Sequence, residues 1–229
     1  MQKALRKQSP KVDNALDIQE RPRLSARGEA TRQKLLEGAE KAFREKGYHG
    51  ARVADIAGNA GVAIGNFYRH FENKNVIFLE ILKPFFRGLL EVTGRQDGDE
   101  SVLTQAQLAE RNVRYITYYT EHQRLFIAAY EAAASPQSDH FFPTWIELRD
   151  RFFARTKGWL RSLIKNGILP ESTDVEFIGE ALGNMNEHYV YIRIVQLERM
   201  PDQQEIELMA NSLAKLWWRA LFLESDAEK

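Results

Sequence analysis

The chain has 229 residues, no cysteine, and 32 basic against 32 acidic side chains, so its formal net charge is zero. The lack of cysteine excludes a disulfide framework and a thiolate metal site. No stretch reaches the roughly 18 uninterrupted apolar residues of a membrane span, and the N-terminus has no apolar signal core. We therefore expect a cytoplasmic protein with no membrane partner.

The charges are unevenly distributed along the chain. Residues 1–75 contain 15 basic and 9 acidic side chains, whereas residues 76–229 contain 17 and 23. A basic N-terminal part followed by an acidic remainder is typical of a chain in which one domain contacts a polyanion and the other does not.

Residues 1–26 are polar, basic and aperiodic, and they include Pro10 and Pro22. This composition predicts a flexible arm. Two interpretations stay open for it. The arm is either a solvated tail or a segment that contacts DNA phosphates or the minor groove.

From Arg27 onward, apolar residues recur every three or four positions, which predicts helices. No segment combines period-two alternation with turn dipeptides, so we expect no sheet. The predicted class is all-α with about nine helices. The predicted helices cover residues 27–46, 52–58, 62–70, 74–92, 101–120, 123–134, 140–165, 173–198 and 203–223.

Individual residues mark several of the helix boundaries. Gly47 is a typical helix stop, and Asn73 is a typical N-cap for the helix that follows it. Thr173 with Glu176 has the spacing of a capping box. Pro84 lies inside the predicted helix 74–92 and is expected to kink it.

Residues 53–71 have the residue types that a helix-turn-helix requires. Ala57 is small enough for two short helices to cross closely. Gly61, four positions later, tolerates the positive φ of a tight turn. Val62 and Phe67 would hold the second helix against the first.

The stretch IAGNAGVAIGNFYRHFENK, residues 56–74, resembles the TetR-family signature, commonly IA-x-x-AGVS-x-GTLY-x-HF-x-SK. The matching residues are Ile56, Ala57, Ala60, Gly61, Val62, Gly65, Tyr68, His70, Phe71 and Lys74. The resemblance covers about residues 31–82. It implies a three-helix DNA-binding domain over 27–72 and a helical ligand-binding and dimerisation domain over 73–229. It also implies a repressor that binds palindromic operator DNA as a homodimer and is released by a small ligand.

The second short helix of the motif would lie in the major groove, which is wide enough for one helix. The residues expected to face the bases are Ala63, Ile64, Gly65, Asn66, Tyr68 and Arg69. The resemblance implies that Tyr68, His70 and Lys74 mainly bind phosphates. Arg52 stands where the family usually has a capping Ser or Thr, and its charge could replace that phosphate contact.

The remainder of the chain is rich in aromatic residues at helical spacing, which fits either a packed core or an aromatic ligand cavity. Residues 180–191 resemble the corresponding helix of EthR-like members of the family, in which an asparagine lies near the polar end of a hydrophobic channel. Asn186 is the matching residue. The predicted ligand-binding residues are Phe86, Tyr119, Tyr130, Trp145, Phe152, Met185, Asn186 and Tyr189, and the expected ligand is small and hydrophobic or aromatic. By the same resemblance, the last two helices would form the dimer interface.

Other functional classes are less favoured. The sequence contains no HExxH, GxSxG, P-loop or GxGxxG motif, and its five histidines are scattered. We therefore expect no catalytic residue, no metal and no cofactor. Two alternatives to a ligand-released repressor stay open: a DNA-binding protein without ligand control, and an activator regulated by a protein partner.

Overall fold

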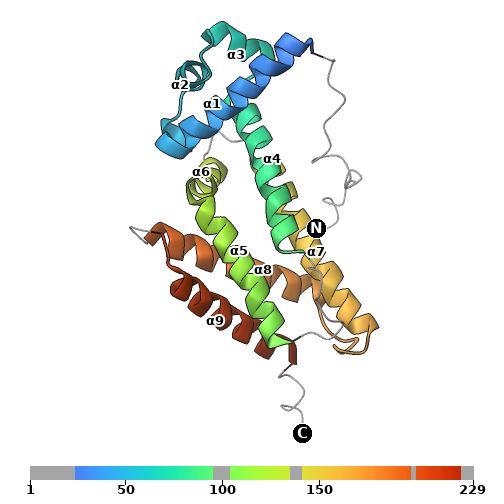
Figure 1. Cartoon of the computed structure of the whole chain (residues 1–229). Coiled ribbons are helices and arrows are strands. Elements are labelled where there is room, and N and C mark those ends of the chain that lie inside the picture. The colour runs from blue at the N-terminus through green and yellow to red at the C-terminus, as the bar shows by residue number, and fades with distance from the viewer. Residues whose placement is uncertain (1–23, 95–103, 135–140, 197–199, 223–229) are drawn as a thin grey trace, which may run out of the picture.

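A computed structural model describes residues 24–94, 104–134, 141–196 and 200–222. These ranges contain nine α-helices and no strand, which confirms the predicted all-α class (Figure 1). The helices are α1 (Ala26–Gly50), α2 (Val53–Asn59), α3 (Ile64–His70), α4 (Lys74–Val92), α5 (Gln105–Glu121), α6 (Gln123–Ala133), α7 (Phe141–Lys165), α8 (Val175–Gln196) and α9 (Gln203–Phe222). Most of the predicted basic arm, residues 1–23, lies outside the described residues.

The predicted start of α4 is confirmed by its cap. The Asn73 side chain accepts hydrogen bonds from the backbone N–H groups of Asn75, at 2.9 Å, and Val76, at 3.1 Å. These bonds satisfy donors that have no partner within the first turn of a helix. The helix then continues through Pro84 to Val92.

The predicted capping box at the start of α8 is wrong. The N-terminal donor, the backbone N–H of Phe177, bonds at 3.0 Å to the carboxylate of Asp174 instead of to Thr173. The Thr173 hydroxyl donates to the backbone oxygen of Pro170, and Glu176 pairs with Lys157. The box failed because a carboxylate one residue closer to the helix competes successfully for the same donor.

Helices α1, α2 and α3, here called the N-terminal unit, lie at one end of the molecule (Figure 1). Gly38 of α1 allows α2 to approach closely, since a Cβ atom there would lie 2.7 Å from the backbone oxygen of Ile56. Leu35, Ile56 and Phe67 are fully buried between the three helices.

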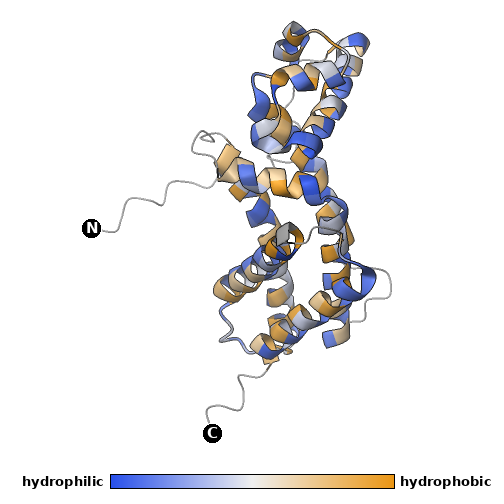
Figure 2. Cartoon of the chain, turned by 90° about the vertical axis from the view of Figure 1, so that its left-hand side faces the viewer, coloured by the Kyte–Doolittle hydropathy of each residue, from blue (hydrophilic) through white to orange (hydrophobic). Residues whose placement is uncertain are grey.

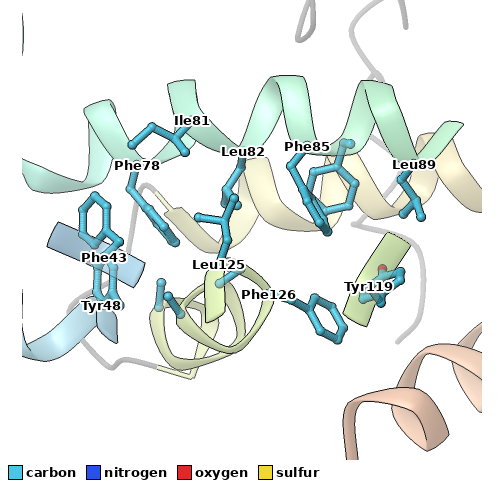
Figure 3. Packing of buried hydrophobic residues seen from close by; sticks show 14 of the residues in the cluster. Phe43, Tyr48, Phe78, Ile81, Leu82, Phe85, Leu89, Tyr119, Leu125 and Phe126 are labelled. Carbon is cyan, nitrogen blue, oxygen red and sulfur yellow. The ribbon is translucent and has the colours of Figure 1, made fainter. Parts of the chain in front are cut away.

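Helix α4 runs from the N-terminal unit into the remaining helices, α5–α9, here called the C-terminal body (Figure 1). Figure 3 shows its apolar side packed against residues from both parts. Phe78 lies 4.4 Å, centroid to centroid, from Phe43 of α1, and Phe85 lies 6.4 Å from Phe126 of α6. The N-terminal unit and the body therefore share one hydrophobic core.

A second connection between the two parts runs from α6 to the end of α1. The backbone N–H of Tyr48 donates to the Glu131 carboxylate at 2.9 Å, and Arg124 donates to the backbone oxygen of Arg44 at 3.2 Å. Gly47 has φ +68°, and a Cβ atom there would lie 2.8 Å from a Glu131 oxygen. Glycine is thus required here both by its backbone conformation and by the close carboxylate.

The C-terminal body is built from amphipathic helices, and apolar and polar positions alternate along each ribbon (Figure 2). Helix α5 packs along α9, and α7 packs along α8. A second buried cluster, which includes Leu160, Leu182 and Trp217, joins α7, α8 and α9 at the far end of the body. In the described part of the chain, no helix is long and apolar enough to cross a membrane.

Candidate nucleic-acid interface and candidate effector cavity

The connection between α2 and α3 has the geometry of a helix-turn-helix. Gly61 has φ +65°, and the N–H of Val62 bonds back to the oxygen of Ala57 at 3.0 Å. Phe67 is fully buried and fixes α3 against the unit. The Asn59 side chain donates to the backbone oxygen of Gly38 at 3.1 Å, which ties the end of α2 to α1. These contacts leave the opposite side of α3 facing solvent.

The N-terminus of α2 is capped by a residue that the sequence analysis missed. Position 52 lacks a capping hydroxyl, but the Asp55 carboxylate accepts the backbone N–H of Arg52 at 2.9 Å. Lys46 also donates to Asp55 at 2.6 Å, and this hydrogen bond holds the pKa of Asp55 below its usual value. The sequence feature that could have predicted this cap is the acidic residue at the third position of the helix, Asp55. The Arg52 side chain itself is exposed.

The outer face of α3 exposes most of the residues that were expected to contact DNA. Ile64 is 49% exposed and Tyr68 is 59% exposed, and Asn66 is half-buried. A Cβ atom at Gly65 would meet no heavy atom within 4 Å, so the fold itself gives no reason for glycine there. The exposed members of the predicted set are Arg52, Ala63, Ile64, Gly65, Tyr68 and Arg69.

Lys74 and His70 are placed differently from the other predicted contacts. The Lys74 amino group donates to the backbone oxygens of Tyr48, at 2.7 Å, and Ala51, at 3.2 Å, and burial lowers its pKa. It therefore fastens the segment that enters α2. His70 is half-buried, and its Nδ1 atom is buried with no hydrogen-bond partner among the described residues.

A small cavity of about 30 Å³ lies in the C-terminal body, beside the C-terminal end of α4. It is lined by Thr93, Leu108, Arg111, Asn112, Tyr115, Phe152, Thr156, Gly183, Asn186 and Trp217. Of the predicted ligand-binding residues, Phe152 and Asn186 reach it.

The other predicted ligand-binding residues do not line this cavity. Phe86, Tyr119 and Trp145 are buried in the shared core, and Tyr130 stacks on Tyr191 with ring centroids 4.2 Å apart. Met185 is partly buried between the two clusters, and Tyr189 is 38% exposed. Helical periodicity identifies the side chains that face inward, but it does not distinguish those that flank a void from those that pack on one another.

Asn186 belongs to a chain of buried hydrogen bonds that joins three helices. Its side-chain oxygen accepts the Trp217 indole N–H at 2.9 Å, and its amide donates to Asn112 at 3.2 Å. Asn112 in turn donates to the backbone oxygen of Ala210 at 3.3 Å. Asn112 was missed, although a polar residue on the apolar side of a helix is the same signal that identified Asn186.

Two arginines hold the C-terminal end of α4. Arg155 of α7 donates to the Thr93 hydroxyl at 2.7 Å and to the backbone oxygens of Leu90 and Thr93. Arg114 of α5 donates to the backbone oxygen of Val92 at 2.9 Å. Burial of the Arg155 guanidinium lowers its pKa.

Residues 35–81 match the family model described as bacterial regulatory proteins, tetR family. This part of the chain, which includes α2 and α3, is similar to that family. The uncharacterized HTH-type transcriptional regulator YvdT of Bacillus subtilis is 28% identical over 137 residues, which cover 59% of this chain and 66% of YvdT. The HTH-type transcriptional repressor DhaR of Mycobacterium sp. is 31% identical over 123 residues, covering 51% of this chain and 62% of DhaR. The matched regions thus span less than two thirds of either relative.

The TetR fold extends beyond the DNA-binding domain. The crystal structure of FadR from Bacillus subtilis in complex with stearoyl-CoA superposes with a TM-score of 0.63 and 22% identity. The superposition covers 81% of this chain and 96% of FadR. The likeness shows that the C-terminal body has the helical arrangement found in that TetR-fold protein.

Proposed function

We propose that the chain is a TetR-family transcriptional repressor that binds palindromic operator DNA as a homodimer in the cytoplasm and is released by a small apolar ligand. Residues 27–72 would bind DNA, and residues 73–229 would bind the ligand and dimerise. The observation that carries the proposal is the outer face of α3. Its exposed side chains, Ile64 and Tyr68, flank a glycine that intramolecular packing does not require. DhaR, which is 31% identical over 123 residues, is named a transcriptional repressor.

The proposed roles in DNA binding follow from the chemistry of each side chain. Asn66 can both donate to and accept from an adenine edge, Ile64 can pack on a thymine methyl, and Arg69 can reach guanine or phosphate. Tyr68 and Arg52 are exposed and would bind phosphates, which position the domain without specifying sequence. For His70 and Lys74, a phosphate role requires their partly buried groups to move.

The ligand-binding part of the proposal rests on the fold and on the aromatic composition of the body. FadR, whose fold matches, was crystallised with stearoyl-CoA. The similarity of residues 180–191 to EthR-like members, with Asn186 at the polar end of the site, belongs to the same proposal. The predicted apolar residues would then separate to admit a ligand.

One observation favours a second candidate, a DNA-binding protein without ligand control. The cavity of about 30 Å³ is far smaller than the roughly 300–1,000 Å³ of a typical ligand site. The two candidates differ in one measurable property, because only a ligand-released repressor loses operator affinity when a compound binds the body.

The DNA-binding function is tested with duplexes selected from a random palindromic library. We expect binding that weakens steeply with salt, since phosphate contacts release counterions. Asn66→Ala should lower affinity about tenfold and relax the preference at one base pair per half-site, because a bidentate base contact contributes about 1–3 kcal/mol. Asn166→Ala, at an exposed position after α7, is the control. The proposal fails if no palindromic duplex is preferred at any salt concentration.

A further inference from the structure

The carbonyl groups where α1 ends have a partner on another helix. The last four C=O groups of a helix have no N–H donor within it. The Lys74 ammonium, at the start of α4, donates to the backbone oxygens of Tyr48 at 2.7 Å and of Ala51, the C-cap of α1, at 3.2 Å. Basic side chains stabilise helix C-termini in this way, because the free carbonyls carry partial negative charge. Lys74 therefore caps α1 from outside that helix.

The Lys74 ammonium is engaged inside the protein. An ammonium group has three N–H donors, and the two backbone oxygens take two of them. The nitrogen also lies 4.3 Å from the centroid of the Tyr48 ring, at the distance of a cation–π interaction. If Lys74 turned toward a DNA phosphate, two backbone oxygens in a partly buried place would lose their donor, which is unfavourable.

Tyr48 is held through all three of its polar groups. Its carbonyl accepts from Lys74, its N–H donates to the Glu131 carboxylate of α6 at 2.9 Å, and its hydroxyl donates to the Asn75 side chain. The residue is buried, at 5% exposure. The first turn of α4 thus fixes the end of α1 through two neighbouring side chains, Lys74 and Asn75.

The fixed segment leads directly to a residue proposed to bind DNA. Arg52 follows Ala51 and immediately precedes α2, and its side chain is exposed. Its backbone N–H donates to Asp55 at 2.9 Å. The backbone at Arg52 is therefore held from one side by Asp55 and from the other by Lys74, which bonds to the oxygen of the preceding residue.

We infer that Lys74 is a positioning residue for DNA binding. It holds the connection between α1 and α2 so that the Arg52 side chain meets a phosphate, and Lys74 itself contacts no phosphate. The inference rests on the proposed function, in which Arg52 binds the DNA backbone. It differs from the expectation based on the family resemblance, in which Lys74 is itself a phosphate ligand.

The test is a double-mutant cycle on the full-length chain, with an operator duplex selected from the random palindromic library. The salt dependence of operator affinity is measured for Lys74→Met, for Arg52→Gln and for the double variant. Each phosphate contact adds about 0.9 to the slope of log affinity against log salt. Arg52→Gln removes one contact per subunit of a dimer, so it should lower the slope by about 1.8.

Lys74→Met should also lower the slope in the original chain, by up to about 1.8, because Arg52 would lose its position. In the Arg52→Gln background it should change nothing further. The double variant should therefore have the slope of Arg52→Gln, and its affinity should agree with that variant within about twofold, the error expected for such comparisons.

Lys165→Met is the matched control, since it removes one charge at an exposed position in the last turn of α7. It should leave the slope and the affinity unchanged. Thermal unfolding shows that each variant is folded. If Lys74→Met is unfolded at the assay temperature, Lys74→Gln, which keeps a polar side chain, takes its place in the cycle.

The inference is overturned if the Lys74 variant lowers the slope by a further 1.8 or so in the Arg52→Gln background, because Lys74 would then neutralise a phosphate of its own. It is equally overturned if the two losses of affinity add at an unchanged slope, which indicates a general loss of stability, or if either single variant binds like the original chain. Each of these results presupposes operator binding by the original chain, and the proposed function fails only without such binding.

Discussion

Gly65 occupies the first turn of α3, where a Cβ atom would meet no heavy atom within 4 Å. Its φ is not positive. In a helix, glycine is less favourable than alanine by about 0.5–1 kcal/mol. The protein therefore carries a destabilising residue that its own packing does not require, at the surface proposed to meet DNA.

We predict that Gly65→Ala raises the free energy of unfolding by up to about 1 kcal/mol and lowers operator affinity about tenfold, the size of one lost base-pair contact. The added methyl would hold the helix away from the groove. Chemical denaturation and fluorescence anisotropy measure the two effects.

Gly158 of α7 is the matched control, since a Cβ atom there also meets nothing within 4 Å. Gly158→Ala should give the same stabilisation with unchanged operator affinity. If both variants bind operator like the original chain, Gly65 has no role in DNA approach.

At the scale of single residues, the sequence correctly predicted the placement of side chains whose partners lie only a few positions away in the chain. The inward position of Phe67 and the cap at Asn73 follow from short-range spacing, and the structure has both. The partners of Lys74 could not be predicted, because they are backbone oxygens 23 and 26 residues earlier in the chain. For the same reason Asn112 was missed, since its bonds reach α8 and α9.

At the scale of elements, helix α6 holds the end of α1 through the Glu131 carboxylate. The bond to the Tyr48 N–H joins the C-terminal body to the segment that enters α2. Helix α4 is thus not the sole connection between the body and the N-terminal unit, and movement of α6 would also act on the helix-turn-helix.

We predict that Glu131→Ala lowers the free energy of unfolding by about 1–2 kcal/mol, because it leaves a partly buried N–H without its charged acceptor. Exchange of the Tyr48 amide proton, followed by NMR, should become faster. Glu131→Gln keeps an acceptor oxygen and should recover at least half of the stability. Unchanged Tyr48 exchange in Glu131→Ala would show that this hydrogen bond does not hold the junction.

The sequence predicted helices better than it predicted some of their ends. The bounds of α4 match the prediction because Asn73 and the segment after Val92 are clear local signals. The start of α8 was misplaced because two adjacent residues, Thr173 and Asp174, can both cap a helix. Spacing alone does not decide which of the two accepts the first-turn N–H.

At the scale of the whole molecule, helix α9 exposes two leucines eight residues apart, and therefore on the same side of the helix. Leu208 is 69% exposed and Leu216 is 50% exposed, and Phe177 of α8 is 69% exposed. Apolar exposure of this kind is typical of a surface that is covered in an assembly. The proposed homodimer would cover it.

We predict that Leu208→Glu and Leu216→Glu each shift the protein from dimer to monomer in analytical ultracentrifugation, because a carboxylate at an apolar interface must lose its hydration. Operator affinity should fall with them, since two half-sites require two linked domains. Phe142→Glu, on α7 and 49% exposed in the original chain, is the control. A dimer that persists in both leucine variants would contradict this interface.

The candidate effector site was the least predictable part of the molecule. The sequence identified Phe152 and Asn186, yet the cavity is completed by Thr93 after α4, by Arg111 of α5 and by Thr156, one turn beyond Phe152 on α7. The position of a cavity depends on how the helices pack against one another. Tyr119 and Trp145 have the same inward helical spacing as the cavity residues, but they are buried in the packed core.

The core shared by α1, α4 and α6 has a thermodynamic consequence. Phe43, Phe78 and Phe126 belong to one continuous cluster, so the N-terminal unit has no separate interior that could melt by itself. A compound that binds only the folded body would then protect the helix-turn-helix from heat and proteolysis by the same free energy. The ligand and operator DNA would favour different conformations of the protein, yet each would stabilise the folded state. The regulator released from DNA would therefore stay folded.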